Sequence, residues 1–273
     1  MPATDLIRTV ESDGSRVDVS LAGGHVTSWI PAGGSEVLFL SRSAIVAPGS
    51  SIRGGVPVIF PQFADLGPLP KHGFARTAMW EVAEPESGDV LTLHLRDDAQ
   101  TRGIWPHRFL LSLGVFVDAG RLRIALRVRN EGDTAFDFTC ALHTYLRVGG
   151  IDELVVDGLQ GVRFRDKTAD GRYVEHDSPL RISDQVDSVY EHAPNVVTVR
   201  DGGNARSIEI HKSRFADVVV WNPWQEGAST LSDMEDEEYR EMLCVEAAQV
   251  SKPVRLAPGE RWEGVQEIVA RPA

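Results

Sequence analysis

Hydrophobic and polar residues alternate with a period of two along most of the chain. The alternation is clearest in five segments, which also carry β-branched residues and are separated by Gly, Asn and Asp: 15–30, 89–98, 109–132, 207–222 and 261–270. Successive side chains of a β-strand point to opposite faces of a sheet, so the pattern predicts strands with one buried face. We therefore expect an all-β fold of large antiparallel sheets with few short helices.

Residues 121–148 are predicted to form one long hairpin. Two runs of alternating apolar residues flank the turn-forming sequence "NEGD": Leu122, Ile124, Leu126 and Val128 before it, and Phe136, Phe138, Cys140 and Leu142 after it. Each run presents its apolar residues on one face of a strand. Antiparallel pairing of the two runs is the natural outcome of this order.

A helix is convincingly indicated only in "STLSDMEDEEYREM", residues 229–242. Ser232 and Glu235 fit a capping box, and acidic residues crowd the positive end of the helix dipole. A calcium-binding loop is the alternative for so acidic a run. The glycine that an EF-hand loop needs at its sixth position is absent, however, and the ligand spacing is wrong, so the helix is preferred.

The chain shows no internal repeat and no low-complexity linker over its 273 residues, of which 42% are hydrophobic. One large core is therefore possible, and residues 1–273 are predicted to form a single domain. The sequence "MPATDLIRTVESDG" lacks the basic and apolar regions of a signal peptide, and no apolar run approaches the roughly 18 residues of a spanning helix. A cytoplasmic protein with no membrane partner is the expectation.

The formal net charge of -12 argues against a sequence-independent hold on nucleic acid, which depends on many Lys and Arg contacts to phosphates. A small-molecule partner is expected instead. The two cysteines, Cys140 and Cys244, lie in apolar strand-like runs, where buried free thiols are favoured over a disulfide or a metal site. The oligomeric state stays open, a monomer included.

A basic loop interrupts this acidic chain at residues 53–76, "RGGVPVIFPQFADLGPLPKHGFAR". It carries Arg53, Lys71 and Arg76 against Asp65 alone, together with four glycines and four prolines. Proline restricts φ and glycine permits close approach, so such a loop can be rigid without being regular. Solvation is the ordinary state of any single one of these cations. Three of them in a stiff frame favour a small dianionic ligand, phosphate above all.

Two further residues could carry proton transfer. His143, in "CALHTYLR", is predicted to lie on a strand, where a lone histidine is usually a surface or satisfied core residue. Glu246, in "MLCVEAAQV", has apolar neighbours. It is therefore either near an exposed strand end or desolvated, and desolvation would raise its pKa toward the range of a general base. Trp221 and Trp224 could stack on a sugar, although core packing is the more usual use of an indole.

Six motifs taken together resemble the hexose-6-phosphate mutarotase (glucose-6-phosphate 1-epimerase) family of the aldose 1-epimerase-like superfamily. They are "RGGVPVIFPQF", "PKHGFAR", "HTYLRVGGID", "VDSVY", "VVVWNPW" and "MLCVEAAQV", in this order. The resemblance extends from "LAGGHVTSW" to "LAPGERWEG", which is nearly the whole chain. It implies a galactose-mutarotase-like β-supersandwich and interconversion of hexose 6-phosphate anomers without a metal or organic cofactor.

The resemblance also implies roles for seven residues. The catalytic positions are His143 and Glu246, with His72 as a second active-site histidine, and the substrate-binding positions are Arg53, Lys71, Arg76 and Asp187. Lys71 departs from the pattern, because some members carry a neutral glutamine before the His-Gly pair. That difference leaves the phosphate geometry, and with it the preferred sugar, open.

Anomerisation explains these residue types. A base must remove the proton of O1 while an acid protonates the ring oxygen O5, and the two exchange roles when the ring recloses. Glu246 suits the base, His143 suits the acid, and the basic loop would hold the distant phosphate. Three alternatives remain: a mutarotase for unphosphorylated aldoses, a non-catalytic sugar-phosphate-binding module, and a retaining glycoside hydrolase. A retaining glycoside hydrolase needs two carboxylates about 5–5.5 Å apart, for which Glu246 with Asp187 or Asp233 is the candidate pair.

Overall fold

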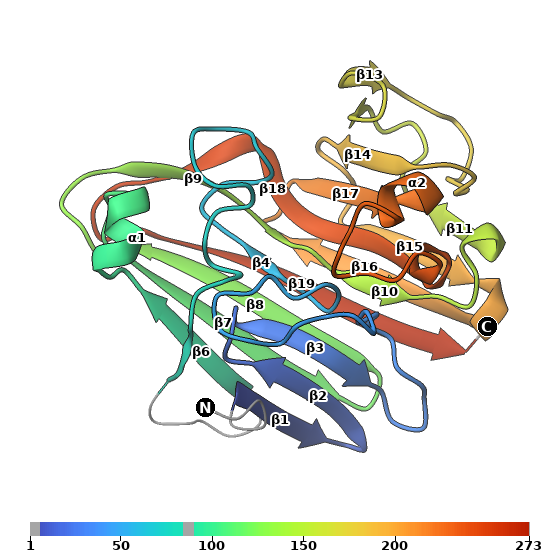
Figure 1. The fold of residues 1–273 in the computed structure, drawn as a ribbon, viewed down its shortest axis with the longest axis horizontal. Helices are drawn as coiled ribbons and strands as arrows, with labels where there is room; N and C mark the ends of the chain where they lie inside the picture. Colours follow the sequence, from blue (N-terminus) through green and yellow to red (C-terminus); the bar gives the residue numbers. More distant parts are fainter. Residues whose placement is uncertain (1–5, 84–89, 273) are drawn as a thin grey trace.

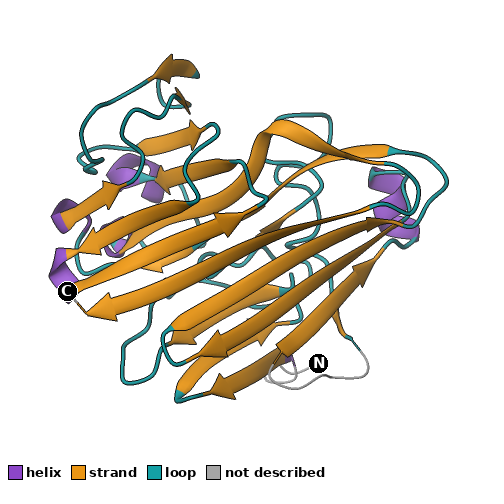
Figure 2. Ribbon diagram, turned by 180° about the vertical axis from the view of Figure 1, so that it is seen from behind, coloured by secondary structure: helices purple, strands orange, loops and turns teal. Residues whose placement is uncertain are grey.

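Three antiparallel sheets make up the computed structural model, which describes residues 6–83 and 90–272 (Figures 1 and 2). The smallest has the order β1-β2-β3. Its strands are β1 (Ile7–Ser12), β2 (Ser15–Ser20) and β3 (His25–Ile30). Strands β1 and β2 contact β7 of a larger sheet, so this small sheet lies along one side of the molecule.

An eight-stranded sheet, called the site sheet below, has the order β13-β12-β14-β17-β18-β9-β4, with β10 also paired to β18. Its strands are β4 (Val58–Ile59), β9 (Phe136–Leu142), β10 (Tyr145–Arg147), β12 (Phe164–Asp166), β13 (Arg172–Val174), β14 (Val186–Tyr190), β17 (Asp217–Asn222) and β18 (Met242–Leu256).

The second eight-stranded sheet, called the back sheet, has the order β11-β15-β16-β19-β8-β7-β6-β5. Its strands are β5 (Glu81–Val82), β6 (Val90–Arg96), β7 (Phe109–Asp118), β8 (Arg121–Asn130), β11 (Leu154–Asp157), β15 (Val196–Asp201), β16 (Arg206–Ser213) and β19 (Arg261–Pro272). The described parts of all five segments predicted from period-two alternation contain strands, so the all-β prediction is confirmed.

The hydrophobic core lies between the site sheet and the back sheet. Leu122 and Ile124 of β8 enter it from the back sheet, while Val245 and Ala247 of β18 enter it from the site sheet. Alternation along β18 leaves its other side chains, including Glu246, on the opposite face of the site sheet. Both cysteines are buried free thiols, as predicted.

The predicted hairpin over residues 121–148 is wrong. Strand β8 pairs with β7 and β19 in the back sheet, whereas β9 pairs with β18 and β4 in the site sheet. The apolar residues of both strands nevertheless face one core, as expected. Two strands facing each other across a sandwich need the same alternation as two strands in one hairpin, so the pattern cannot distinguish these arrangements.

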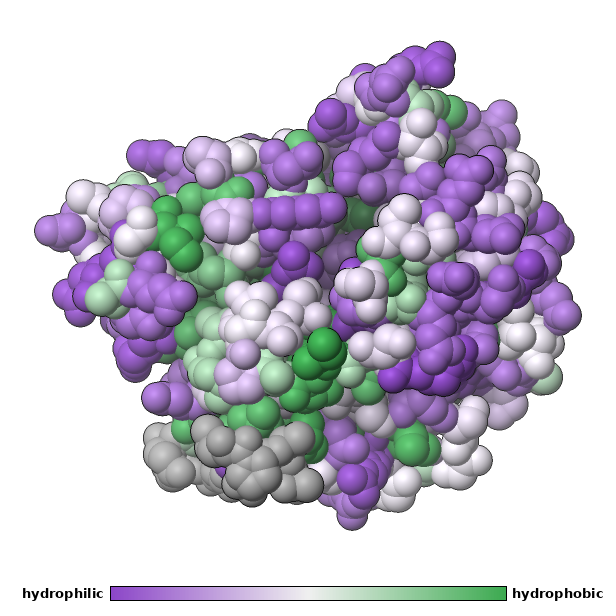
Figure 3. Space-filling view, viewed as in Figure 1, coloured by the Kyte–Doolittle hydropathy of each residue, from purple (hydrophilic) through white to green (hydrophobic). Residues whose placement is uncertain are grey.

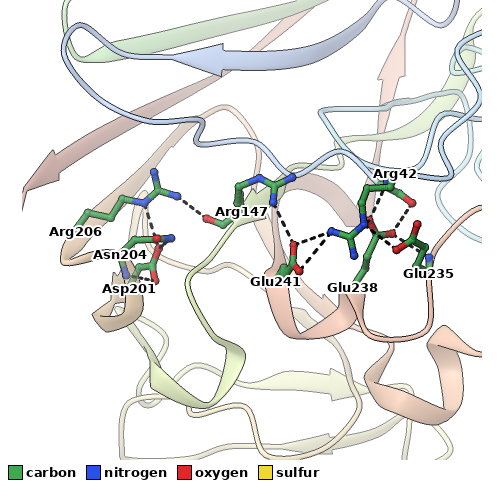
Figure 4. A network of polar contacts seen from close by, with 9 residues as sticks. Arg42, Arg147, Asp201, Asn204, Arg206, Glu235, Glu238 and Glu241 are labelled. Carbon is green, nitrogen blue, oxygen red and sulfur yellow. Dashed lines mark hydrogen bonds and ion pairs between the residues drawn. The ribbon is translucent and has the colours of Figure 1, made fainter.

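The predicted helix at residues 229–242 is also wrong. Residues 229–237 form turns and irregular backbone, and only Glu238–Glu241 form a 3₁₀ helix, η4. The acidic side chains bind partners far away in the sequence. Glu238 is fully buried and accepts hydrogen bonds from Ser41 Oγ and the Arg42 backbone N (2.6 and 2.8 Å). Glu235 pairs with the Arg42 guanidinium at 2.8 Å (Figure 4). These tertiary contacts outweigh the local capping preference.

The helices observed are short and lie elsewhere: α1 (Ala99–Ile104), α2 (Trp224–Ala228), η2 (Ile151–Glu153) and η3 (Gly202–Asn204). Helix α1 begins at a capping box of Asp98 and Thr101, a signal present in the sequence. Within residues 6–83 and 90–272, no helix is long and apolar enough to cross a membrane.

Candidate active site

Side chains from four neighbouring strands meet on the face of the site sheet that points away from the core. The register aligns Asp187 of β14 with Trp221 of β17, and Trp221 with Cys244 of β18. Cys244 pairs in turn with Tyr145 of β10. Glu246 lies two residues beyond Cys244, so its side chain shares this face. Residues from distant parts of the sequence are therefore neighbours here.

Loops enclose this face from two sides. Apolar side chains from the segments 53–76 and 229–241 pack onto this face of the site sheet in two small clusters. The clusters also contain Phe39, Ala141, Tyr145, Val189, Val219, Ala228, Met242, Cys244 and Ala248. The space-filling view shows a hollow near the middle of the molecule, between these two chain segments (Figure 3). The polar groups described next are thus held in largely apolar surroundings.

His143 and Glu246 form the centre of the face. His143 follows β9 directly, in a short break before β10 rather than within a strand as predicted, and its ring stacks on Tyr145 with centroids 4.8 Å apart. Its Nε2 lies 3.3 Å from Oε1 of Glu246. Three buried atoms here have no hydrogen-bond partner among the described residues: both carboxyl oxygens of Glu246 and Nδ1 of His143. Unpartnered buried polar atoms are costly, which marks a place where a polar ligand would bind.

Burial displaces the pKa values of this pair in opposite directions. Glu246 is only 1% exposed, and desolvation, reinforced by the negative charge of Asp187, raises its pKa well above the usual range. Desolvation lowers the pKa of His143 well below its usual range, and His72 and Arg53 lower it further. Between these two displaced titrations the pair holds one proton, and the two titrations belong to both residues together.

His72 approaches this pair from the basic loop, with its ring centroid 5.7 Å from that of His143. The backbone N of Ala64 donates a hydrogen bond to His72 Nδ1 (3.2 Å), so the proton of the neutral ring is on Nε2. Burial, followed by the charges of Arg76 and Lys71, lowers the pKa of His72 to about 3. Gly73 follows with φ +68°, and a side chain there would collide with the carbonyl oxygen of Phe60.

The two arginines of the loop flank the histidines. Arg53 Nη1 donates to Tyr145 Oη at 3.0 Å, and its Nε and Nη2 both lie 3.1 Å from Asp233 Oδ1. Arg76 Nη2 donates to the backbone oxygen of Lys71 at 3.2 Å, while its buried Nε has no partner among the described residues. Both arginines contribute to the lowered pKa of His143, so their charges lie close to it.

The remaining predicted residues lie at the edge of this group. Lys71 is exposed, but its charge reaches His72. Asp187 accepts a hydrogen bond from Lys167 Nζ at 2.8 Å and lies close enough to Glu246 to raise its pKa. Within the described ranges, no group of three or more His, Cys, Asp or Glu side chains is arranged to hold a metal ion.

The aldose 1-epimerase family model matches residues 5–269 of this chain. The chain belongs to the aldose 1-epimerase family. It is 38% identical to a protein of Cenchrus ciliaris named "putative glucose-6-phosphate 1-epimerase", over 94% of this chain and 82% of that one. A protein of the same name from Escherichia coli K12 is 36% identical, over 94% and 90% of the two chains.

Solved structures agree with this aldose 1-epimerase membership. A crystal structure titled as that of a "putative mutarotase" from Salmonella typhimurium superposes with a TM-score of 0.90, at 31% identity over 98% of this chain and 90% of that one. A Synechocystis protein of 21% identity has a TM-score of 0.85, over 98% and 96% of the chains, and supports the fold alone. The galactose-mutarotase-like fold that the sequence motifs imply is thereby confirmed.

The candidate site contains residues that the sequence did not single out for it. Lys167 joins through its ion pair with Asp187, and nothing in its own sequence context indicates this. Tyr145 lies two residues after His143, a period-two spacing that could have placed it beside the histidine. Of the two tryptophans, Trp221 lies 6.1 Å from the His143 ring, whereas Trp224 packs against Tyr239 in one of the apolar clusters.

Proposed function

We propose that this protein is an isomerase that interconverts the α and β anomers of a D-hexose 6-phosphate, with glucose 6-phosphate as the first candidate. The observation that carries the proposal is the buried Glu246 carboxyl, which has no hydrogen-bond partner among the described residues and lies 3.3 Å from His143. His143 in turn lies close to the charges of Arg53 and Arg76. An acid, a base and a dianion handle are what the reaction requires. The names of the relatives support the same reaction.

Glu246 and His143 are proposed to move the two protons. Glu246 removes the proton of O1 as His143 protonates O5, so the bond between C1 and O5 breaks and an open aldehyde forms. After rotation about the bond from C1 to C2, the ring recloses with the protons returned in the reverse sense. One proton shared by the pair is sufficient, because ring opening moves it from His143 to O5 while the O1 proton arrives on Glu246, and reclosure reverses both transfers. The displaced pKa values favour this proton on Glu246 in the free protein, so it must lie on His143 before the ring opens.

The substrate phosphate is proposed to help charge His143. Arg53 and Arg76 contribute to lowering the pKa of this histidine in the free protein. A dianionic phosphate bound to these arginines would offset their positive charge. The imidazolium form then becomes more accessible when the substrate is in place. The handle and the acid are thus coupled electrostatically.

His72 is proposed to orient the sugar rather than to supply the proton. With a pKa of about 3 it stays neutral at physiological pH. Because Nδ1 accepts from Ala64, the ring proton is on Nε2, which can donate to a sugar oxygen. We expect His72→Asn to raise KM for the hexose 6-phosphate more than it lowers kcat, with the alkaline limb of the pH profile retained. Steady-state kinetics across pH measure both quantities. Loss of the alkaline limb in this variant would give the acid role to His72 instead.

Arg76 is proposed to bind the phosphate together with Arg53 and Lys71, with Asp187 as a further substrate-binding residue. Its unpartnered buried Nε supports this. We expect Arg76→Ala to weaken hexose 6-phosphate binding by about 1.5–3 kcal/mol, the scale of a hydrogen bond to a charged group, and to change binding of the free hexose little. Calorimetric titration with glucose 6-phosphate and with glucose measures this. Equal losses for both ligands would make Arg76 a structural or catalytic residue.

The direct test of the function is exchange between the two anomer signals, followed by NMR with the protein present. We expect faster exchange for glucose 6-phosphate than for glucose. Equal exchange rates for glucose 6-phosphate and glucose would favour a mutarotase for unphosphorylated aldoses. If the protein accelerated exchange of no hexose phosphate in a panel, the non-catalytic binding module would be the remaining function. The glycosidase alternative is disfavoured because its candidate partners, Asp187 and Asp233, are already ion-paired with Lys167 and Arg53.

The single-domain prediction for residues 1–273 is supported by one hydrophobic core that joins both large sheets. The small-molecule substrate follows from the family, whereas specificity for its phosphate is part of the proposal. A cytoplasmic location and the absence of nucleic-acid and membrane partners stay predictions, and no cofactor is assigned to the reaction.

A further inference from the structure

Asp233 holds the guanidinium group of Arg53 in the free protein. Two nitrogens of Arg53 lie 3.1 Å from the same carboxylate oxygen, and a third donates to Tyr145 Oη. Only 20% of the Arg53 side chain and 26% of the Asp233 side chain are exposed. These contacts engage three of the five guanidinium N–H groups and occupy the Nε and Nη2 edge, one of the two edges that can bind an oxyanion in a bidentate manner. A phosphate that is to bind Arg53 through this edge must displace the Asp233 carboxylate.

The same carboxylate also acts on Arg76. Asp233 is close enough to stabilise the charge of Arg76, whereas the neighbouring Arg53 destabilises it. Two cations thus share one carboxylate, and the Nε of Arg76 is buried without a partner among the described residues. One carboxylate carries a single negative charge, whereas a phosphate monoester carries nearly two and offers three acceptor oxygens. The phosphate would match the two arginines better than Asp233 does.

The loop that carries Asp233 is anchored independently of this ion pair. Met234 is buried in an apolar cluster with Tyr239. Glu238, fully buried, accepts hydrogen bonds from Ser41 and from the backbone of Arg42 and Glu235 (Figure 4). Asp233 can therefore rotate away from Arg53 while the rest of its loop stays in place.

We propose that Asp233 is a built-in competitor of the substrate phosphate, and this inference rests on the proposed function. Its carboxylate neutralises Arg53 in the free protein, and the phosphate of the sugar takes its place on binding. Breaking the ion pair between Asp233 and Arg53 costs free energy, which offsets part of the free energy gained when the phosphate binds Arg53. Substrate and product carry the same handle, so a weaker hold on that handle speeds product release.

The test compares Asp233→Asn with a matched control in the same loop, Glu235→Gln. Both variants remove one negative charge, but Glu235 pairs with Arg42 outside the site. Affinities for inorganic phosphate and for glucose 6-phosphate are measured by calorimetry, and stability by thermal unfolding. We expect Asp233→Asn to tighten both ligands about 3- to 10-fold, the scale of a partly exposed ion pair, and Glu235→Gln to change them less than about twofold. Asp233→Ala, which also lacks the carboxylate, should tighten them likewise.

A double-mutant cycle with Arg53→Gln tests the mechanism. If Asp233 competes for Arg53, the Asn substitution should no longer tighten phosphate once Arg53 is gone. The inference is overturned if Asp233→Asn weakens both ligands, which would make Asp233 a sugar ligand or an anchor for Arg53. It is also overturned if Glu235→Gln tightens them equally, because the effect would then be one of net charge.

Anomer exchange by the unaltered protein separates this inference from the proposed function. If that protein does not accelerate exchange but Asp233→Asn tightens inorganic phosphate, the proposed function fails and the competition for Arg53 stands. If exchange is accelerated but no affinity changes in Asp233→Asn, only the competition is wrong.

Discussion

Glu246→Gln is expected to lower the rate of anomer exchange by about 10²- to 10⁴-fold, the contribution of one positioned general base. The amide keeps the size and polarity of the side chain but cannot accept the O1 proton. No hydrogen bond is lost, because neither oxygen of the carboxyl has a partner among the described residues. NMR exchange spectroscopy on glucose 6-phosphate measures the rate, and thermal unfolding tests the fold.

Glu238→Gln is the matched control, since Glu238 is the other almost completely buried glutamate within residues 6–83 and 90–272. Its carboxylate accepts hydrogen bonds from Ser41 Oγ and from two backbone N–H groups. An amide cannot accept all of these, so this variant should lose stability rather than the chemical step. Near-normal exchange in a folded Glu246→Gln protein would remove Glu246 from the mechanism.

His143→Asn is expected to lower kcat severely, again by about 10²-fold or more, and to abolish the alkaline limb of the pH profile. The unaltered pair works with one shared proton. Its rate falls in acid, where the pair gains a second proton, and in alkali, where it loses the first. In the variant, activity requires only that Glu246 be ionised. Because the pKa of Glu246 is raised, the ionised fraction grows as the pH rises through that pKa. The rate should then increase with pH and reach a plateau.

The pH dependence of kcat from about pH 5 to 10 measures this difference. His107→Asn provides the control, because His107 packs against Trp105 and Phe136 outside the site. The control should keep both limbs. A His143→Asn profile that still falls in alkali would show that another group donates the proton to O5, with His72 as the first candidate.

Sequence periodicity determined which residues of each strand face the core. Leu122 and Ile124 of β8, and Phe136 and Phe138 of β9, are buried as their alternation predicts. Side-chain direction along a strand is a local property with a period of two, so it is readable from the sequence. The choice of partner strand is not local. Strands β8 and β9 belong to different sheets that line one core, and only the packing of two whole sheets decides this.

The acidic run at residues 229–242 shows the same division for helices. Its capping signal is real in the sequence, but Glu238 and Glu235 are held by Ser41 and Arg42, nearly two hundred residues away. A capping box is worth about 1 kcal/mol, and several buried hydrogen bonds to a carboxylate outweigh it. In the short helix α1, by contrast, Asp98 and Thr101 bond each other in the capping box, and the helix begins where this local signal predicts.

For the candidate site, the sequence determined which residue types were available, and the tertiary structure decided which of them meet. Glu246 could have been exposed or desolvated, and the two apolar clusters on the site sheet make it desolvated. The partners of Arg53 and Asp187, namely Asp233 and Lys167, come from loops whose own sequences do not indicate them. Electrostatic interactions depend on distance in space and on burial, and neither is encoded in the local sequence.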